Sequence, residues 1–178
     1  MFKRLESSGY SFILSLSRHL LRNKIYEYAI RNNLPLPIGK QEMNFFDEGI
    51  VESDSSEMEI SADYQFAYDH FDDTAADYYS TMQTKYSHRF SWIRSGLFKE
   101  SLLENLVADS RRLVQIIDSV GTWKSSDDSK INALETLMTV TKPNDKILIF
   151  TQYADTAEYL YQQLSIRGIP ALARVTGD

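Results

Sequence analysis

Three polar residues, Thr151, Gln152 and Tyr153, stand directly after an uninterrupted β-prone run at residues 147–150. Such a run is typical of a strand buried on both faces of a parallel sheet, and α/β sheets usually place their binding groups at the carboxyl ends of such strands. Hydroxyl, amide and backbone N–H groups at that place suit contacts with nucleic-acid phosphates, which position a strand without reading its sequence. The alternative is that Thr151 and Gln152 only cap and orient the helix that follows.

A pair of arginines forms a second candidate site. Arg111 and Arg112 lie in the middle of a helix that the sequence predicts over residues 98–120. Their side chains either face phosphate or pair with Asp109 and Asp118. No arrangement of Ser, His and Asp has the context of a nucleophilic site, so we expect no catalytic residue in the chain.

The residues after Tyr153 predict the element that orients the first site. Asp155 and Glu158 have the spacing of an acidic helix cap and its return partner. Gly168 is placed to end the helix, and residues 171–176 are predicted to form the next strand. A strand, a helix and a second strand make a βαβ unit. One face of the helix is expected to be apolar, through Ala157, Leu160, Tyr161 and Leu164.

The rest of the chain is predicted to be helical. Residues 1–33 form a basic helix with a cap at Ser11, and residues 63–86 form an amphipathic helix with an acidic face. We expect the acidic face to bind a cation or a basic partner, to mimic nucleic acid, or to be simply solvated. The segment Ser125-Ser-Asp-Asp128 is predicted to cap a short helix. Residues 142–145 then turn into the first strand. The fold class is therefore mostly α with a C-terminal βαβ unit.

Charge and composition narrow the function classes. The net charge is −6, made up of +5 in residues 1–40, −12 in residues 41–84 and +1 in the remainder. Because the chain has no cysteine and only three histidines, a zinc site is not expected. No apolar run approaches the ~20 residues that span a bilayer. We expect a cytoplasmic protein with no membrane partner.

Three short motifs resemble one family. Residues 146–160 resemble motif IV of superfamily II helicases and are most similar to the Swi/Snf-like ATPases, where this segment opens the second RecA-like lobe. Residues 3–8 resemble the Lys-Arg-x-Glu-Ser-Ser box that follows the first lobe. Residues 128–130 resemble the Ser-x-Lys-type start of the second lobe, and Thr176 with Gly177 resembles its Thr-Gly element.

The resemblance implies a nucleic-acid motor in which motif IV touches the DNA or RNA backbone. It also implies ATP and Mg²⁺ as cofactors of the full-length protein. This chain has neither a phosphate loop nor an acidic Mg²⁺ box. Because phosphoryl transfer needs both, we expect a fragment that binds no cofactor or metal and does not hydrolyse ATP alone. Its partners would be nucleic acid and the missing helicase lobes of the same chain.

The expected organisation has four parts. Residues 1–40 are a helical segment following the first lobe, residues 41–62 an acidic flexible linker, residues 63–125 a helical insertion, and residues 126–178 the truncated start of the second lobe. An alternative from another class is a self-standing helical module that binds a basic protein through its acidic face. That alternative needs only amphipathic helices, which the chain has.

Overall fold

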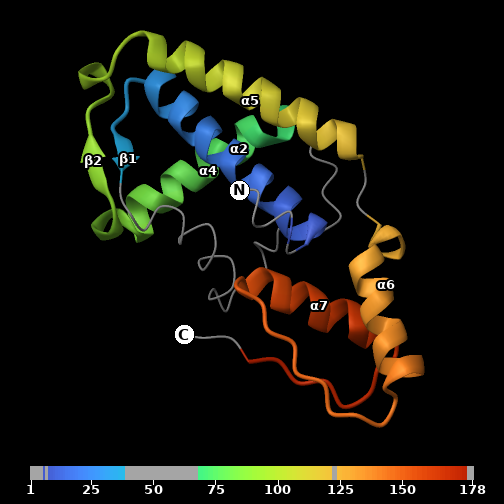
Figure 1. Ribbon diagram of the computed structural model, residues 1–178. Helices are drawn as coiled ribbons and strands as arrows, with labels where there is room; N and C mark the ends of the chain where they lie inside the picture. Colours follow the sequence, from blue (N-terminus) through green and yellow to red (C-terminus); the bar gives the residue numbers. More distant parts are fainter. Residues whose placement is uncertain (1–5, 7, 39–67, 122–123, 176–178) are drawn as a thin grey trace. The chain divides into compact units, whose positions relative to one another are not determined.

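The computed structural model describes residues 6, 8–38, 68–121 and 124–175, with side chains omitted for residues 68–73 (Figure 1). The chain forms two compact units. Unit 1 comprises Met1–Ser15 and Gly121–Asp178, and unit 2 comprises Leu16–Val120. The acidic linker expected at residues 41–62 lies outside the described residues, as do Thr176 and Gly177.

Helices make up most of the described chain, as the sequence predicts. The helices are α2 (Gly9–Arg31), α4 (Tyr68–Lys85), α5 (Ser101–Val120), α6 (Ser129–Thr136) and α7 (Ala154–Ile166). The strands are β1 (Leu36–Ile38) and β2 (Ser91–Ile93). Short 3-10 turns are η1 (Ser87–Arg89), η2 (Ser95–Leu97) and η3 (Ser125–Asp127), and a π-helical turn, η4 (Leu137–Thr141), extends α6.

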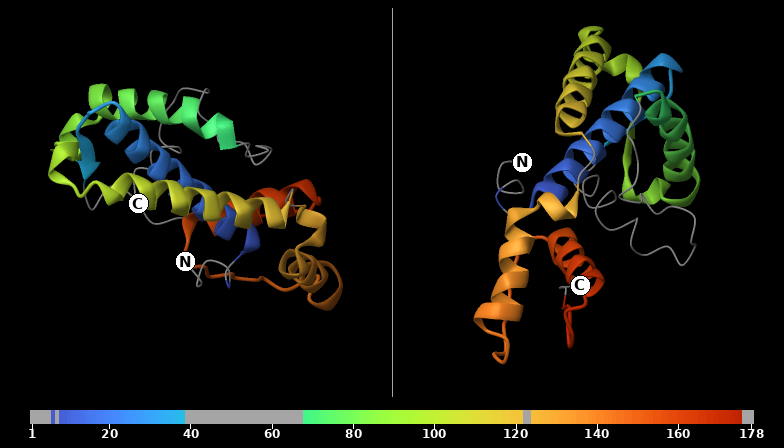
Figure 2. Two further views of the ribbon diagram at one scale, coloured as in Figure 1. Left: turned by 90° about the horizontal axis from the view of Figure 1, so that it is seen from above. Right: turned by 90° about the vertical axis from the view of Figure 1, so that its right-hand side faces the viewer.

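Unit 2 is built around α2, with α4 and α5 on either side of it (Figure 2). A helix flanked in this way must be apolar on more than one face. The apolar core of unit 2 includes Leu16, Leu20, Leu21, Ile25, Ala29, Tyr78, Met82 and Leu113, all at most 9% exposed. Val120 is 44% exposed because it is the last residue of α5.

A small antiparallel sheet joins the loops of unit 2. Leu36 pairs with Ile93 and Pro37 with Trp92. Pro37 is tolerated there because a two-stranded sheet has only edge strands, where a missing N–H breaks no central ladder. The phenol of Tyr79 on α4 donates a hydrogen bond of 2.8 Å to the Pro35 carbonyl, and burial raises its pKa.

Buried charge fixes α5 against α2. Glu27 accepts a 2.6 Å hydrogen bond from the Ser110 hydroxyl and lies 3.7 Å from the Lys24 ammonium. The side chains of Lys24 and Glu27 are 2% and 3% exposed. A buried ion pair is tolerated only where further hydrogen bonds satisfy it, and Ser110 supplies one.

Unit 1 has its own core on α6 and α7. Ile131, Tyr159 and Leu164 are buried there. The start of α2 completes this core: the ring of Tyr10 stacks on Tyr159 with centroids 4.6 Å apart, and the hydroxyls of Ser11 and Thr156 are 2.9 Å apart. Ser11 is therefore a core residue of unit 1. The cap expected at Ser11 is made by Ser8, whose hydroxyl accepts the Ser11 N–H at 3.4 Å.

The two strands of the expected βαβ unit are not paired in the described residues. The described sheet consists of β1 and β2 alone, so residues 146–150 and 172–175 have no strand partner. Leu148, Ile149 and Phe150 are 73%, 44% and 90% exposed, which contradicts their expected burial. A β-prone run becomes a strand only where another strand receives its hydrogen bonds.

The buried face of α7 agrees in part with the predicted one. Leu164 is buried and Leu160 packs against the same core, as predicted, whereas Tyr161 is 39% exposed. Thr156 and Tyr159, which the prediction did not include, are buried as well. Tyr159 is buried because the ring of Tyr10 stacks on it.

Candidate functional site

The predicted contact residues lie together on the loop that leads into α7. Thr151 and Tyr153 are half-buried, and Gln152 is exposed. The Thr151 hydroxyl accepts the N–H of Tyr153 at 3.4 Å, and Tyr153 is the residue that precedes the helix. Thr151 therefore shapes the start of α7, while Gln152 presents its amide to solvent. Both interpretations of this loop keep physical support.

The acidic cap expected on α7 is absent from the structure. Tyr153 occupies the cap position, and Asp155 lies in the first helical turn instead. A carboxylate in the first turn still favours the helix through its dipole. Glu158 does not return to the cap: it forms an ion pair with Arg174 and accepts a 2.9 Å hydrogen bond from Gln162.

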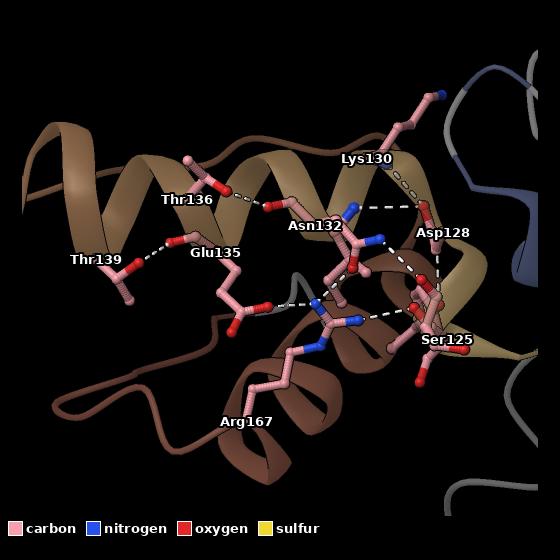
Figure 3. Close-up of polar contacts among 11 residues, drawn as sticks. Ser125, Asp128, Lys130, Asn132, Glu135, Thr136, Thr139 and Arg167 are labelled. Atoms are coloured by element: carbon pink, nitrogen blue, oxygen red, sulfur yellow. Dashed lines mark hydrogen bonds and ion pairs between the residues drawn. The ribbon is translucent and has the colours of Figure 1, made fainter.

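Asp128 holds the neighbouring helix and is confirmed as its cap. One carboxylate oxygen accepts the N–H groups of Lys130 and Ile131 at 3.0 and 3.3 Å, and the other accepts the Tyr159 phenol at 3.0 Å (Figure 3). Asp128 is only 7% exposed. A single side chain thus starts α6 and ties it to α7, which carries the candidate loop.

Arg167 makes a second connection between the same helices. Its guanidinium donates to the Asn132 amide oxygen at 2.7 Å, to the Ser125 carbonyl at 2.7 Å and to Glu135, with which it also forms an ion pair (Figure 3). The Arg167 side chain is 15% exposed. The sequence does not predict this cluster, because its members are 32 to 42 positions from Arg167. Residues so far apart produce no helical or strand periodicity that would point to a contact.

Gly168 ends α7 as predicted. Its φ is +78°, a left-handed conformation that glycine adopts without the Cβ penalty. The N–H groups of Gly168 and Ile169 donate 3.0 Å bonds to Ser165 and Leu164, closing the last turn. Both ends of α7 are therefore defined, so the loop at residues 151–153 is attached to a fixed helix.

The arginine pair belongs to unit 2, whereas the loop at residues 151–153 belongs to unit 1. Arg111 and Arg112 are both exposed on α5. Arg112 pairs with Asp109 at 3.4 Å, an exposed contact of the kind that contributes ~0.3–0.5 kcal/mol on a helix. Neither arginine forms an ion pair with Asp118 within the described residues. Arg111 keeps its charge available to an external anion.

Three basic side chains of α2 already contact residues of the same helix. Lys24 is buried against Glu27, which also pairs with Arg31 at 3.7 Å. Arg22 approaches the His19 ring at 3.2 Å. Burial first, and then the Arg22 charge, lowers the pKa of His19, while the Asp109 carboxylate raises it.

The described residues contain no group of three or more His, Cys, Asp or Glu side chains arranged to hold a metal ion. Among the described helices, none has the length and apolar content needed to cross a membrane. Comparison with known proteins adds no relative: no protein-family model, curated protein or solved structure matches this chain.

Proposed function

We propose that this chain is the inter-lobe segment of an ATP-dependent nucleic-acid translocase of the Swi/Snf-like class, with residues 126–178 opening a RecA-like lobe. In such a motor, ATP closes two lobes and shifts their grip on the nucleic-acid backbone. Thr151, Gln152 and the backbone of Tyr153 would supply part of that grip. The chain itself would not hydrolyse ATP, which needs a phosphate loop and a metal box.

The observation that carries the proposal is the exposed apolar run before α7. Leu148 and Phe150 are 73% and 90% exposed, and Val175, in the second expected strand, is 92% exposed. Fully burying one such side chain stabilises a fold by about 1.5–3 kcal/mol. The two β-prone segments flank a helix, and their apolar side chains are not buried. This arrangement is typical of strands whose neighbours in the sheet would come from further elements of the lobe.

The ordered frame around the run supports the same proposal. Asp128 and Arg167 hold α6 to α7, and Gly168 closes α7. The helices are therefore defined even though the strands are unpaired. A motif at the start of α7 would then have a fixed support, as phosphate contacts need.

The test is nucleic-acid binding by the chain, measured as fluorescence anisotropy with labelled DNA and RNA of mixed sequence at increasing salt. We expect weak binding that is independent of sequence and falls steeply with salt. The variant T151A/Q152A removes a hydroxyl and an amide, each expected to hydrogen-bond a charged phosphate. Because such bonds are worth about 1.5–3 kcal/mol each, binding should weaken at least about tenfold.

The matched control is T139A/Q162A, which removes the same two groups from exposed positions on η4 and α7. This variant should bind as the unchanged chain does, and T151S should restore the hydroxyl contact. Equal binding by T151A/Q152A and T139A/Q162A would assign the loop to helix capping alone. A chain that binds neither DNA nor RNA at low salt would refute the translocase and favour the helical interaction module, with its acidic segment as the binding surface.

A further inference from the structure

A stretch of positive charge connects α4 to α5, and neither the helicase motifs nor the candidate loop includes it. We call residues 85–99 the basic segment; its cations are Lys85, Arg89, Arg94 and Lys99. It contains no Asp or Glu, and the nearest carboxylates in the sequence are Asp77 and Glu100. The preceding residues 41–84 carry a net charge of −12, so the sign of the chain reverses where this segment begins.

All four cations are exposed, and none forms an ion pair with any carboxylate of the described chain. Other exposed cations do so, as Lys142 does with Asp145 at 3.2 Å. Among the described residues, no carboxylate neutralises the positive charge of the basic segment. Exposed cations without such partners attract polyanions over about a Debye length.

Arg89 is already oriented by an aromatic ring. Its guanidinium carbon lies 5.2 Å from the centroid of the Tyr86 ring. Stacking of this kind uses the face of the guanidinium and leaves the N–H groups at its edge for an acceptor. Phosphate oxygens match that fork of donors.

The backbone between Arg89 and Arg94 is held in place. β2, which lies between these two arginines, pairs with β1. The indole N–H of Trp92 donates a 2.9 Å hydrogen bond to the Ser87 carbonyl. The Trp92 ring also meets the Tyr79 ring edge-on at 5.7 Å. Lys85 is the last residue of α4, Arg89 ends η1, and Arg94 lies between β2 and η2. These three cations thus extend from ordered backbone, which reduces the entropy lost when they bind a ligand.

We propose that the basic segment binds the phosphate backbone of a nucleic acid, independently of sequence. This inference rests on the proposed function and adds to it a second contact surface, in unit 2. Phosphate contact requires only positioned positive charge, which these residues provide. Binding in a membrane interface is typical of amphipathic helices, whereas the segment after Lys85 consists of a strand, 3-10 turns and the residues between them.

The test measures how binding of the whole chain to labelled DNA depends on salt, with a mixed-sequence duplex and its single strand as separate probes. The variant R94Q/K99Q removes two exposed cations that form no ion pair with a described residue. Its control, K124Q/K142Q, removes two exposed cations from unit 1 and changes the net charge equally. Circular dichroism of both variants confirms that they are folded.

For the duplex, the slope of log K against log salt should become shallower by about 1.8 in R94Q/K99Q, because each phosphate contact contributes about 0.9. For the single strand the expected change is about 1.4. The control should keep the slope of the unchanged chain. Equal slopes in the two variants would overturn the inference, and so would competition by polyglutamate as strong as that by DNA of equal charge.

The result also separates this inference from the proposed function. Suppose that T151A/Q152A loses binding, whereas R94Q/K99Q binds with the salt slope of the unchanged chain. The proposed translocase function would then be retained, and the basic segment would not belong to its contact surface. Absence of any binding to DNA or RNA would remove both.

Discussion

The replacement of Asp128 by alanine should destabilise unit 1 by about 2–4 kcal/mol. Loss of the cap on α6 costs about 1 kcal/mol. The Tyr159 phenol, which donates to Asp128 at 3.0 Å, would remain buried without that acceptor, at a cost of about 1–3 kcal/mol. The two costs arise on different helices, so both α6 and α7 should lose protection.

Amide hydrogen exchange is the suitable assay because the chain has two units, and a single global unfolding curve need not report on one of them. Opening free energies would be measured for amides in α6 and α7 of D128A, Y159F and the double variant. The cycle should give a coupling of about 1–2 kcal/mol between the carboxylate and the phenol. D128N, which keeps a cap oxygen, should lose less than D128A.

The control is D127A, which removes an exposed carboxylate from the same turn. Its effect should stay within about 0.5 kcal/mol, as is usual for an exposed position without a buried partner. The reasoning is refuted if D128A loses no more protection than D127A. It is also refuted if the effects of D128A and Y159F simply add, because the carboxylate and the phenol would then act independently.

Three further predictions concern stability. Burial lowers the pKa of His19 below its usual 6.5. As the pH falls through 6.5, His19 is therefore protonated in the unfolded chain before it is protonated in the folded chain, and the free energy of unfolding decreases. In H19Q the urea midpoint should fall less over the same pH range. G168A should cost about 1 kcal/mol at its φ of +78°, whereas G96A, with no positive φ, should cost less by thermal unfolding. E27Q should cost about 3–5 kcal/mol because it removes the charge that faces the buried Lys24. K24M/E27L should cost less in the same melts, because it removes both charges, but the buried Ser110 hydroxyl then lacks its Glu27 acceptor.

Local signals predicted some of the helix ends. The start of α6 at Asp128 and the end of α7 at Gly168 follow from interactions within a few residues, whereas the caps expected at Ser11 and Asp155 were wrong. Gly121 and Gly168 both adopt a positive φ, which is the conformation that makes glycine common after a helix. A single sequence contains this information because caps depend on neighbours along the chain.

Features that depend on distant partners could not be predicted. The run at residues 147–150 has the composition of a strand, yet strand formation depends on a partner that the run does not encode. The buried face of α7 includes Tyr159 because Tyr10 stacks on it, a contact between residues far apart in the sequence. The bond between Ser110 and Glu27 spans 83 positions and had no counterpart in the sequence pattern.

The interleaving of the two units along the chain has a consequence for folding kinetics. Unit 2 is one continuous stretch, whereas unit 1 joins residues that precede it to residues that follow it, as in the bond between Ser11 and Thr156, 145 positions apart. Closing so long a loop carries an entropic cost that contacts within a continuous stretch avoid. During synthesis, unit 2 can therefore fold before α7, which carries the partners of Tyr10 and Ser11, has been made. The amides of unit 1 should be the last in the chain to become protected from hydrogen exchange.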